Sequence, residues 1–361
     1  MSAKEKPDTA VWSGPPIVPG PLRAILVSRL RFMGDIILTT PLLAALRRHY
    51  PEARIGYLAE APYHHLLEHH PAVDELYSFR RGDERSQIGL IRRLRRHRWD
   101  VAIDLFGNPR SAMLLYLSGA RRRIGGDFRG RRYLYTHRIP DPGERMTAIA
   151  FHLSYLAPLG ITGEPLLPVI TVTPGEKVEA RQYLEDRGYD LQRPVIGLHP
   201  GATWPAKRWF PERFAALATR LHEAKMQTLF TMGPGEEPII DAVYRLLPFP
   251  LARPEPLPLR RFAALLSQLR VYVSNDCGPL HLAPAVGTRT VGIFGPGEPD
   301  IWFPYPAAVG HRLVYHALDC SRCHRDLCPD MACMRAITAE EVLTAVQSAL
   351  AHQEAGARAE P

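Results

Sequence analysis

The 361-residue sequence has no apolar run that approaches the roughly 18 uncharged residues of a membrane-spanning helix. Residues 1–20 also lack the apolar core of a signal peptide, and their composition predicts a disordered lead-in. Both absences favour a cytoplasmic protein. There is no repeat at solenoid periods and no coiled-coil heptad, so repeat and fibrous architectures are excluded.

Several common binding motifs are missing as well. The G-x-G-x-x-G fingerprint does not follow the first predicted strand at 24–30, which disfavours a nicotinamide dehydrogenase. The segment 199–211 fails the spacing of a P-loop. Basic motifs interleaved with aromatic residues, which are typical of RNA-binding proteins, are absent, so we expect no nucleic-acid partner.

The chain has instead a globular composition with an excess of positive charge. Hydrophobic residues make up 46% and charged residues 23%, which is enough apolar material for two cores, and the net charge is +8. Five arginines lie in residues 91–99, where exposed helix faces account for them. Six more lie in the glycine-rich segment 120–133, which is better placed to bind an anion. A phosphorylated substrate, nucleic acid or an anionic membrane surface would fit that segment.

Apolar runs alternate with amphipathic segments, a pattern typical of α/β proteins with parallel sheets. We predict strands at 24–30, 53–60, 75–79, 101–107, 195–201, 227–233, 271–276 and 290–295. They indicate two Rossmann-like, doubly wound domains that face each other across a cleft. Their predicted bounds are 21–170 and 194–361, with a connecting segment at 171–193. Ligands of such sheets bind beyond the carboxyl ends of strands, so polar residues there are site candidates.

The segment SRLRFMGDIILTTP (28–41) follows the first predicted strand. Gly34 allows a tight turn, and Asp35 would project near the start of a helix. Asp35 has two interpretations: it complements the helix dipole, or it accepts a proton from an attacking hydroxyl.

The segment HPGATWPAKRWFP (199–211) follows the first strand of the second half. Gly201 would permit close approach of a ligand to the backbone. Thr203 supplies a hydroxyl and Lys207 a point charge, a set that suits a phosphate oxygen. We expect Trp209 to be an ordinary core residue.

Two glutamates follow the next strand, in MGPGEEP (232–238). Glu236 and Glu237 fit the acidic first turn of a helix. One of them would equally accept hydrogen bonds from ribose hydroxyls.

The segment SNDCGPLHLAPAVG (274–287) opens another helix, at Gly278 and Pro279. The amides around Gly278, Leu280 and His281 predict a diphosphate site. Asp276 would repel phosphate, so we expect it to bind sugar hydroxyls or to orient Lys207. His281 also fits a buried histidine that is bonded to nearby backbone.

Four of the five cysteines form a compact group. Their spacing suggests either a structural zinc site or plain structural cysteines under the last helix, with redox-sensitive thiols as a further interpretation. The four are Cys320, Cys323, Cys328 and Cys333.

Together these segments resemble the ADP-heptose:lipopolysaccharide heptosyltransferases, glycosyltransferase family nine. The likeness runs in order from about Pro21 to Leu350. It implies a GT-B fold, with the acceptor bound by the first domain and the nucleotide sugar by the second. It also implies inverting transfer of a heptose to an inner-core lipopolysaccharide acceptor, with no required cofactor, next to the inner face of the inner membrane.

The resemblance also assigns roles to single residues. It implies that Asp35 is the catalytic base. Donor-binding roles fall on Thr203, Lys207, Glu236, Glu237, Asp276, Gly278, Pro279, Leu280 and His281. The segment with Arg121, Arg122, Arg123 and Arg129 would meet the anionic lipid-linked acceptor. Cys277 stands where the family commonly has Ser or Thr, which leaves a hydroxyl role there in doubt.

Two alternatives remain open on the sequence alone. One is a transferase of the same fold that uses another nucleotide-sugar donor. The other is a non-catalytic protein that binds nucleotide sugars or nucleic acid.

Overall fold

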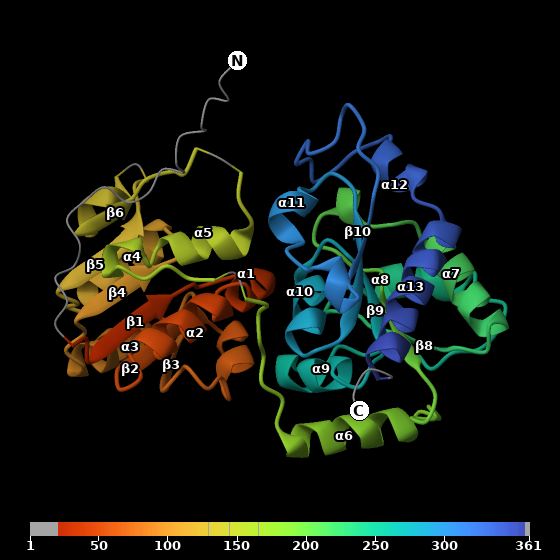
Figure 1. Cartoon of the computed structure of the whole chain (residues 1–361), viewed down its shortest axis with the longest axis horizontal. Helices are drawn as coiled ribbons and strands as arrows, with labels where there is room; N and C mark the ends of the chain where they lie inside the picture. The colour runs from red at the N-terminus through yellow and green to blue at the C-terminus, as the bar shows by residue number, and fades with distance from the viewer. Residues whose placement is uncertain (1–20, 129, 144, 165, 358–361) are drawn as a thin grey trace. The chain divides into compact units, whose positions relative to one another are not determined.

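The computed structural model describes residues 21–128, 130–143, 145–164 and 166–357, with side chains described as far as residue 352. The predicted lead-in at 1–20 lies outside these residues. The chain divides between Pro168 and Val169 into two compact units, called unit 1 and unit 2 below. In Figure 1, unit 1 runs from red to yellow and unit 2 from green to blue.

Unit 1 is a six-stranded parallel sheet flanked by helices, with strand order β3-β2-β1-β4-β5-β6. Its strands are β1 Ala24–Ser28, β2 Arg54–Glu60, β3 Glu75–Phe79, β4 Val101–Asp104, β5 Arg122–Gly126 and β6 His137–Ile139. Its helices are α1 Met33–Ile37, α2 Thr40–His49, α3 Glu84–Arg96, α4 Pro109–Leu117 and α5 Ala148–Ser154, with 3₁₀ turns η1 Tyr63–Leu67, η2 Arg131–Leu134 and η3 Ala157–Leu159.

Unit 2 is a five-stranded parallel sheet with strand order β11-β10-β9-β7-β8. Its strands are β7 Val195–His199, β8 Gln227–Phe230, β9 Val271–Asn275, β10 Arg289–Phe294 and β11 Arg312–Tyr315. Its helices are α6 Pro174–Glu185, α7 Pro211–Glu223, α8 Glu237–Tyr244, α9 Leu259–Leu266, α10 Gly278–Ala285, α11 Pro299–Trp302, α12 Ala332–Ala336 and α13 Ala339–Ala357, with 3₁₀ turns η4 Pro205–Lys207 and η5 Ala307–Val309.

Each sheet has one point at which the strand order reverses. Strand β1 pairs with β2 on one side and with β4 on the other. Strand β7 likewise lies between β8 and β9. Open α/β sheets bind ligands at such points, beyond the carboxyl ends of the strands. All of the predicted motif segments except the arginine cluster and the cysteines follow strands at or beside these two points.

Helices α7 and α13 pack together in the core of unit 2. Phe214, Leu217 and Leu221 of α7 are fully buried and share one cluster with Val342 and Val346 of α13. These apolar rows repeat every three to four residues, so each helix turns one stripe to the sheet. The prediction that Trp209 is a core residue is also confirmed, because its indole is 1% exposed and donates to the Ile337 carbonyl at 3.1 Å.

Two helices begin with a capping box. The Thr173 hydroxyl accepts the Glu176 amide at 3.2 Å, and the Glu176 carboxylate accepts the Thr173 amide at 2.8 Å. Thr338 and Glu341 repeat the arrangement at the start of α13. Each box satisfies amides that the first helical turn leaves without partners. The Glu176 carboxylate also binds Arg260 of α9, so α6 is held against unit 2 although its residues had been predicted as a connecting segment.

Three strands were not predicted. β5 and β6 extend the first sheet, and β11 forms an edge of the second. Glycine and arginine in β5 hide its apolar content, and only its last three residues are buried. Edge strands such as β6 and β11 bury little of their surface, so they have a weak apolar signal.

Within the described part of the chain, no helix is both long and apolar enough to cross a membrane.

Burial lowers the pKa of several histidines, among them His70, His152, His281 and His311. Burial lowers the pKa of both His152 and His281 to about 3. The His152 ring lies 3.2 Å from the Leu38 carbonyl, and the His281 ring lies 2.8 Å from the Tyr305 hydroxyl. Because each ring is enclosed, the folded chain keeps it neutral.

This burial predicts a loss of stability in mild acid. The unfolded chain takes up protons on these histidines near pH 6.5, whereas the folded chain does not until about pH 3. Stability is therefore complete above pH 6.5 and falls as the pH falls below it. Between pH 6.5 and 5, the free energy of unfolding should drop by roughly 1–2 kcal/mol for each histidine. Urea unfolding at several pH values measures the slope. His152→Leu should reduce it, and a slope that this variant leaves unchanged would contradict the assignment.

Candidate functional site

In unit 1, Asp35 lies in the first turn of α1, at the carboxyl end of β1. Its carboxylate pairs with the guanidinium of Arg29, the first residue after β1, and accepts the Phe32 amide at 3.2 Å. The Asp35 side chain is 15% exposed, so the carboxylate is held in place yet open to a ligand. Both interpretations of Asp35 are compatible with this geometry. It lies in the first helical turn, where it complements the helix dipole, and its carboxylate is partly exposed, so it could accept a proton from a ligand.

Arg29 connects Asp35 to the neighbouring strand. Its guanidinium donates to the carbonyl of Leu105, which follows β4, and lies 4.9 Å from the centre of the Phe106 ring. Arg31 lies over the same ring at 5.9 Å. The sequence reasoning missed these arginines, although both lie in the segment that it selected. Two cations and an aromatic face beside a carboxylate form a site suited to an anionic hydroxyl compound.

The loop that carries Phe106 is fixed by a buried carboxylate. Asp104 is fully buried, accepts the amides of Phe106 and Gly107, and accepts the Tyr135 hydroxyl at 2.7 Å. Burial raises the pKa of Asp104, against the effect of these hydrogen bonds. We assign Asp104 a structural role because its oxygens are engaged inside the fold.

The arginines predicted to bind the acceptor lie near the amino ends of the strands, opposite the carboxyl ends where Asp35 lies. Arg122 and Arg123 begin β5 and pair in register with Val101 and Ala102 at the start of β4, and Arg121 precedes them. In a parallel sheet the starts of strands are opposite the carboxyl ends, so the structure does not bring these residues to Asp35. Arg123 also donates to the carbonyls of Ala120 and Leu134. Arg129 lies outside the described residues.

Other arginines lie nearer the carboxyl ends of these strands, each against an aromatic ring. Arg110, in the first turn of α4, lies over Phe79 at the end of β3, at 5.3 Å. Arg131 of η2 lies 5.4 Å from the Phe128 ring, and that ring packs against Gly107 after β4 and Gly126 at the end of β5.

In unit 2, Lys207 and Asp276 form an ion pair of 2.6 Å between Nζ and Oδ2. Asp276 follows β9 and is 6% exposed, whereas Lys207 ends the turn η4 and is 18% exposed. The Lys207 ammonium also lies 4.7 Å from the centre of the Trp204 ring. Of the two alternatives for Asp276, the contact with Lys207 is therefore present in the fold. Since an ammonium has three donors, the others remain available to a ligand.

Neighbouring residues fix the loops that carry this pair. Asn275 donates to the carbonyl of Pro200 at 2.9 Å and accepts the Trp209 amide at 3.1 Å. These bonds tie the loop after β7 to the end of β9. A side chain at Gly297 would meet the Asp276 carboxylate, so glycine there leaves space for it.

Glu236 and Glu237 differ in their surroundings. Glu236 accepts the Gly233 amide at 2.6 Å and lies 3.6 Å from Nε2 of His199. A Cβ atom at Gly201 would meet the Glu236 carboxylate at 2.1 Å. Gly201 thus makes room for Glu236, where we had expected it to make room for a ligand. Glu237 is exposed in the first turn of α8.

The helix start at α10 differs in detail from the prediction. Gly278 and Pro279 open the helix as expected. The Leu280 amide, however, donates to the Cys277 carbonyl at 3.1 Å, and the Leu280 side chain is fully buried. His281 is buried as one interpretation required, but its partner is the Tyr305 hydroxyl rather than backbone.

Two further residues of this region have clear surroundings. Thr203 is exposed in the loop after β7. Burial raises the pKa of the Cys277 thiol to about 12, and its sulfur lies 3.3 Å from the Ser274 hydroxyl. Cys277 therefore stays protonated and is no candidate nucleophile.

The zinc hypothesis gains no support from the structure. Across the described residues, no group of three or more His, Cys, Asp or Glu side chains is placed to hold a metal ion. Cys320 and Cys323 are exposed, Cys328 accepts the Met331 amide at 3.3 Å, and Cys333 is buried. Cys333 packs in the core cluster that includes α13, so for this residue the structural interpretation is confirmed.

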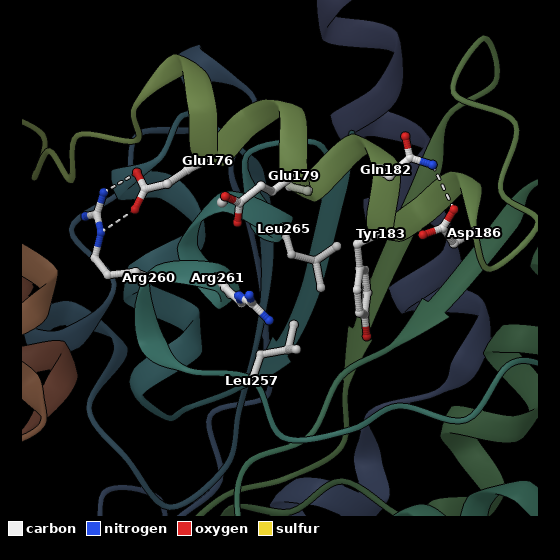
Figure 2. A pocket seen from close by; sticks show the side chains of 11 residues that line it. Glu176, Glu179, Gln182, Tyr183, Asp186, Leu257, Arg260, Arg261 and Leu265 are labelled. Atoms are coloured by element: carbon white, nitrogen blue, oxygen red, sulfur yellow. Dashed lines mark hydrogen bonds and ion pairs between the residues drawn. The ribbon is translucent and has the colours of Figure 1, made fainter.

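A separate cavity of about 390 Å³ lies between α6 and α9 (Figure 2). Tyr183, Leu257 and Leu265 point toward it, and the Arg260–Glu176 ion pair lies at one end. No predicted site residue lines it, so we do not assign it to the candidate site.

Comparison with known proteins supports these motifs. The sequence model described as glycosyltransferase family 9 (heptosyltransferase) matches residues 88–332, more than half of the chain. Lipopolysaccharide heptosyltransferase 3 of Escherichia coli is 26% identical over 301 residues, 76% of this chain and 84% of the relative. Lipopolysaccharide heptosyltransferase 2 of Salmonella typhimurium is 30% identical over 298 residues, 78% of this chain and 85% of the relative.

A solved structure shares the fold. The E. coli ADP-heptose lipopolysaccharide heptosyltransferase II superposes with a TM-score of 0.76 at 23% identity, over 92% of this chain and 100% of that one. The predicted α/β class with two doubly wound sheets is confirmed.

The contact between Gly201 and Glu236 gives a test of the unit 2 geometry. Gly201→Ala should displace the Glu236 carboxylate and lose its hydrogen bond to Gly233, which lowers the free energy of unfolding by about 1 kcal/mol. In a Glu236→Ala background the same substitution should cost much less, because no carboxylate remains to displace. Gly175→Ala is the matched control, since nothing lies within 4 Å of a Cβ added there. Equal costs of Gly201→Ala in both backgrounds, by urea unfolding, would show that the contact is absent.

Proposed function

The chain belongs to glycosyltransferase family 9, and from that premise we propose that it transfers a heptose from ADP-heptose to an inner-core lipopolysaccharide acceptor of the Kdo/heptose-lipid A type. The names of both relatives specify lipopolysaccharide heptosyltransferases, and that of the solved neighbour specifies ADP-heptose. The observation that carries the proposal is the Lys207–Asp276 pair at the switch point of unit 2, where such sheets bind nucleotides.

The donor diphosphate would bind at Lys207. Asp276 binds one side of the ammonium, and the Lys207 side chain, which is 18% exposed, would donate its remaining N–H groups to the diphosphate. The Thr203 hydroxyl and the Gly278 amide at the start of α10 would add neutral donors, while Pro279, which has no amide proton, and His281 would line the same helix turn. Charge develops on the diphosphate as the sugar leaves, and a fixed cation stabilises it. We therefore propose that a divalent metal is not required.

The ribose would bind at Glu236 rather than at Glu237. Glu236 lies beside the loop after β7, with its carboxylate already oriented by the Gly233 amide. Both hydroxyls of a ribose are good donors to such a carboxylate. Glu237 projects from the surface of α8 and has no comparable orientation.

Asp35 would act as the general base. Its Oδ1 is held by Arg29, while Oδ2 has only the Phe32 amide and keeps a lone pair for a proton. It would take the proton of the acceptor hydroxyl as that oxygen attacks the anomeric carbon. Attack opposite the leaving diphosphate inverts the configuration of that carbon.

The proposed acceptor is anionic, and unit 1 has positively charged arginines near the carboxyl ends of its strands. Arg29 and Arg31 over Phe106, with Arg110 and Arg131 on their own rings, supply cations near Asp35. We propose the acceptor there in preference to the start of β5, at the opposite end of the strands, where Arg122 and Arg123 begin the strand and Arg121 precedes it.

A lipid-linked acceptor places the enzyme at a membrane surface. Exposed aromatic side chains of unit 1, among them Tyr116 and Tyr133, lie beneath arginine side chains: Arg123 over Tyr116, and Arg132 and Arg138 over Tyr133. Arginine with an amphipathic ring suits an anionic bilayer interface. We propose a cytoplasmic protein in peripheral contact with the inner face of the inner membrane.

A transfer assay tests this function. The wild-type protein should move heptose from ADP-heptose to the acceptor, and Asp35→Asn should lower kcat by about 100-fold or more, the scale of a lost general base. Calorimetric affinity for ADP should be unchanged, because Asp35 lies in unit 1. Asp83→Asn, at the N-cap of α3, is the matched control and should keep full activity. Wild-type turnover by Asp35→Asn would remove Asp35 as the base.

A further inference from the structure

We infer that His199 is a positioning residue: a buried chain from Tyr272 through Thr231 fixes its ring with a proton on Nε2, and that N–H holds the Glu236 carboxylate in place for the donor. The inference rests on the proposed function, since it concerns the carboxylate to which we assign the ribose.

The chain of contacts crosses three neighbouring strands. His199 ends β7, Thr231 follows β8, and Tyr272 lies in β9. The Thr231 hydroxyl lies 2.7 Å from the Tyr272 hydroxyl and 3.1 Å from Nδ1 of His199. All three residues are buried, so water does not compete for these bonds. A buried polar chain of this kind has to satisfy its donors and acceptors within itself.

The direction of each bond follows from the donors available. The buried phenol of Tyr272 has one proton to place, and the Thr231 hydroxyl is the acceptor within hydrogen-bond distance, so we assign Tyr272 as the donor. Thr231 accepts that hydrogen bond and has one proton of its own to give, toward Nδ1 of His199. An imidazole nitrogen that accepts leaves the proton on the other nitrogen. His199 then presents Nε2–H to Glu236.

The ring acts as a neutral donor. Burial lowers the pKa of His199, while the Glu236 carboxylate and the Thr231 backbone oppose that effect in part. A neutral N–H attracts the carboxylate without cancelling its charge. Glu236 therefore remains an anion. A carboxylate that is not paired with a cation binds ribose hydroxyls more strongly than one that is.

One oxygen of Glu236 is left for the ligand. Oε2 accepts the Gly233 amide at 2.6 Å and is also the atom that lies 3.6 Å from Nε2 of His199. Oε1 takes part in neither contact. Because Gly201 has no side chain, the carboxylate fits between these groups, and its side chain stays 19% exposed.

The tautomer can be measured directly. Long-range proton–nitrogen NMR spectra of the full chain with ¹⁵N-labelled histidine should show His199 protonated on Nε2 only. Tyr272→Phe removes the end of the chain and should shift His199 toward a mixture of tautomers. Tyr244→Phe is the matched control, because this phenol donates to the Ala252 carbonyl elsewhere in unit 2. A wild-type ring protonated on Nδ1 would overturn the inference.

Kinetics test the consequence for the donor. His199→Leu should raise the KM for the nucleotide sugar roughly 2- to 10-fold, the scale of one polar contact, because Nε2 lies 3.6 Å from the Glu236 carboxylate, and kcat should change less than twofold. His199→Gln should restore most of the affinity, because its amide nitrogen reaches the place of Nε2. A loss that Gln does not rescue would show a packing role only.

A double variant separates this inference from the proposed function. In the Glu236→Ala background, His199→Leu should have no further effect on KM or on the affinity for ADP. If Glu236→Ala alone leaves ADP affinity unchanged, the assignment of the ribose to Glu236 fails. If Glu236→Ala weakens binding but His199→Leu does not, the positioning role of His199 alone is wrong.

Discussion

The ion pair between Lys207 and Asp276 is the contact on which the candidate donor site depends. A nearly buried carboxylate is costly without a cation, and a lysine at a loop tip has no fixed position without a partner. The 2.6 Å contact gives the Asp276 carboxylate a cation and gives Lys207 a fixed position, at the switch point between β7 and β9. Asn275 then ties the two loops together, and Gly297 leaves space for the Asp276 carboxylate.

Unit 1 also has an ion pair at its switch point, but there the cation orients the carboxylate. At the switch point between β1 and β4, Arg29, the first residue after β1, pairs with the Asp35 carboxylate. In unit 2 the carboxylate holds the cation that would act, whereas in unit 1 the cation holds the carboxylate that would act. Asp35 and Lys207, the residues that we propose to act, both stay partly exposed, at 15% and 18%. Each lies in a segment that directly follows a strand of a parallel sheet.

Much of this arrangement could be predicted from the sequence, because it depends on local signals. Strands with continuous apolar runs and a polar segment directly after them led to Asp35, Lys207 and Asp276. The sequence did not show at which end of the strands the arginines of β5 lie. This strand was not predicted, so its direction was unknown. His199 was missed as a functional residue because its partners come from β8 and β9, and only the pairing of the strands brings them together.

The most direct test of the account is the affinity of ADP for the full chain, measured by calorimetry for the wild-type protein and for Lys207→Met. If the lysine held by Asp276 binds the diphosphate, the dissociation constant should rise by roughly 10- to 150-fold, which corresponds to about 1.5–3 kcal/mol. Lys177→Met, on helix α6, should leave the affinity unchanged. An ADP affinity that survives the loss of Lys207 would contradict the central claim.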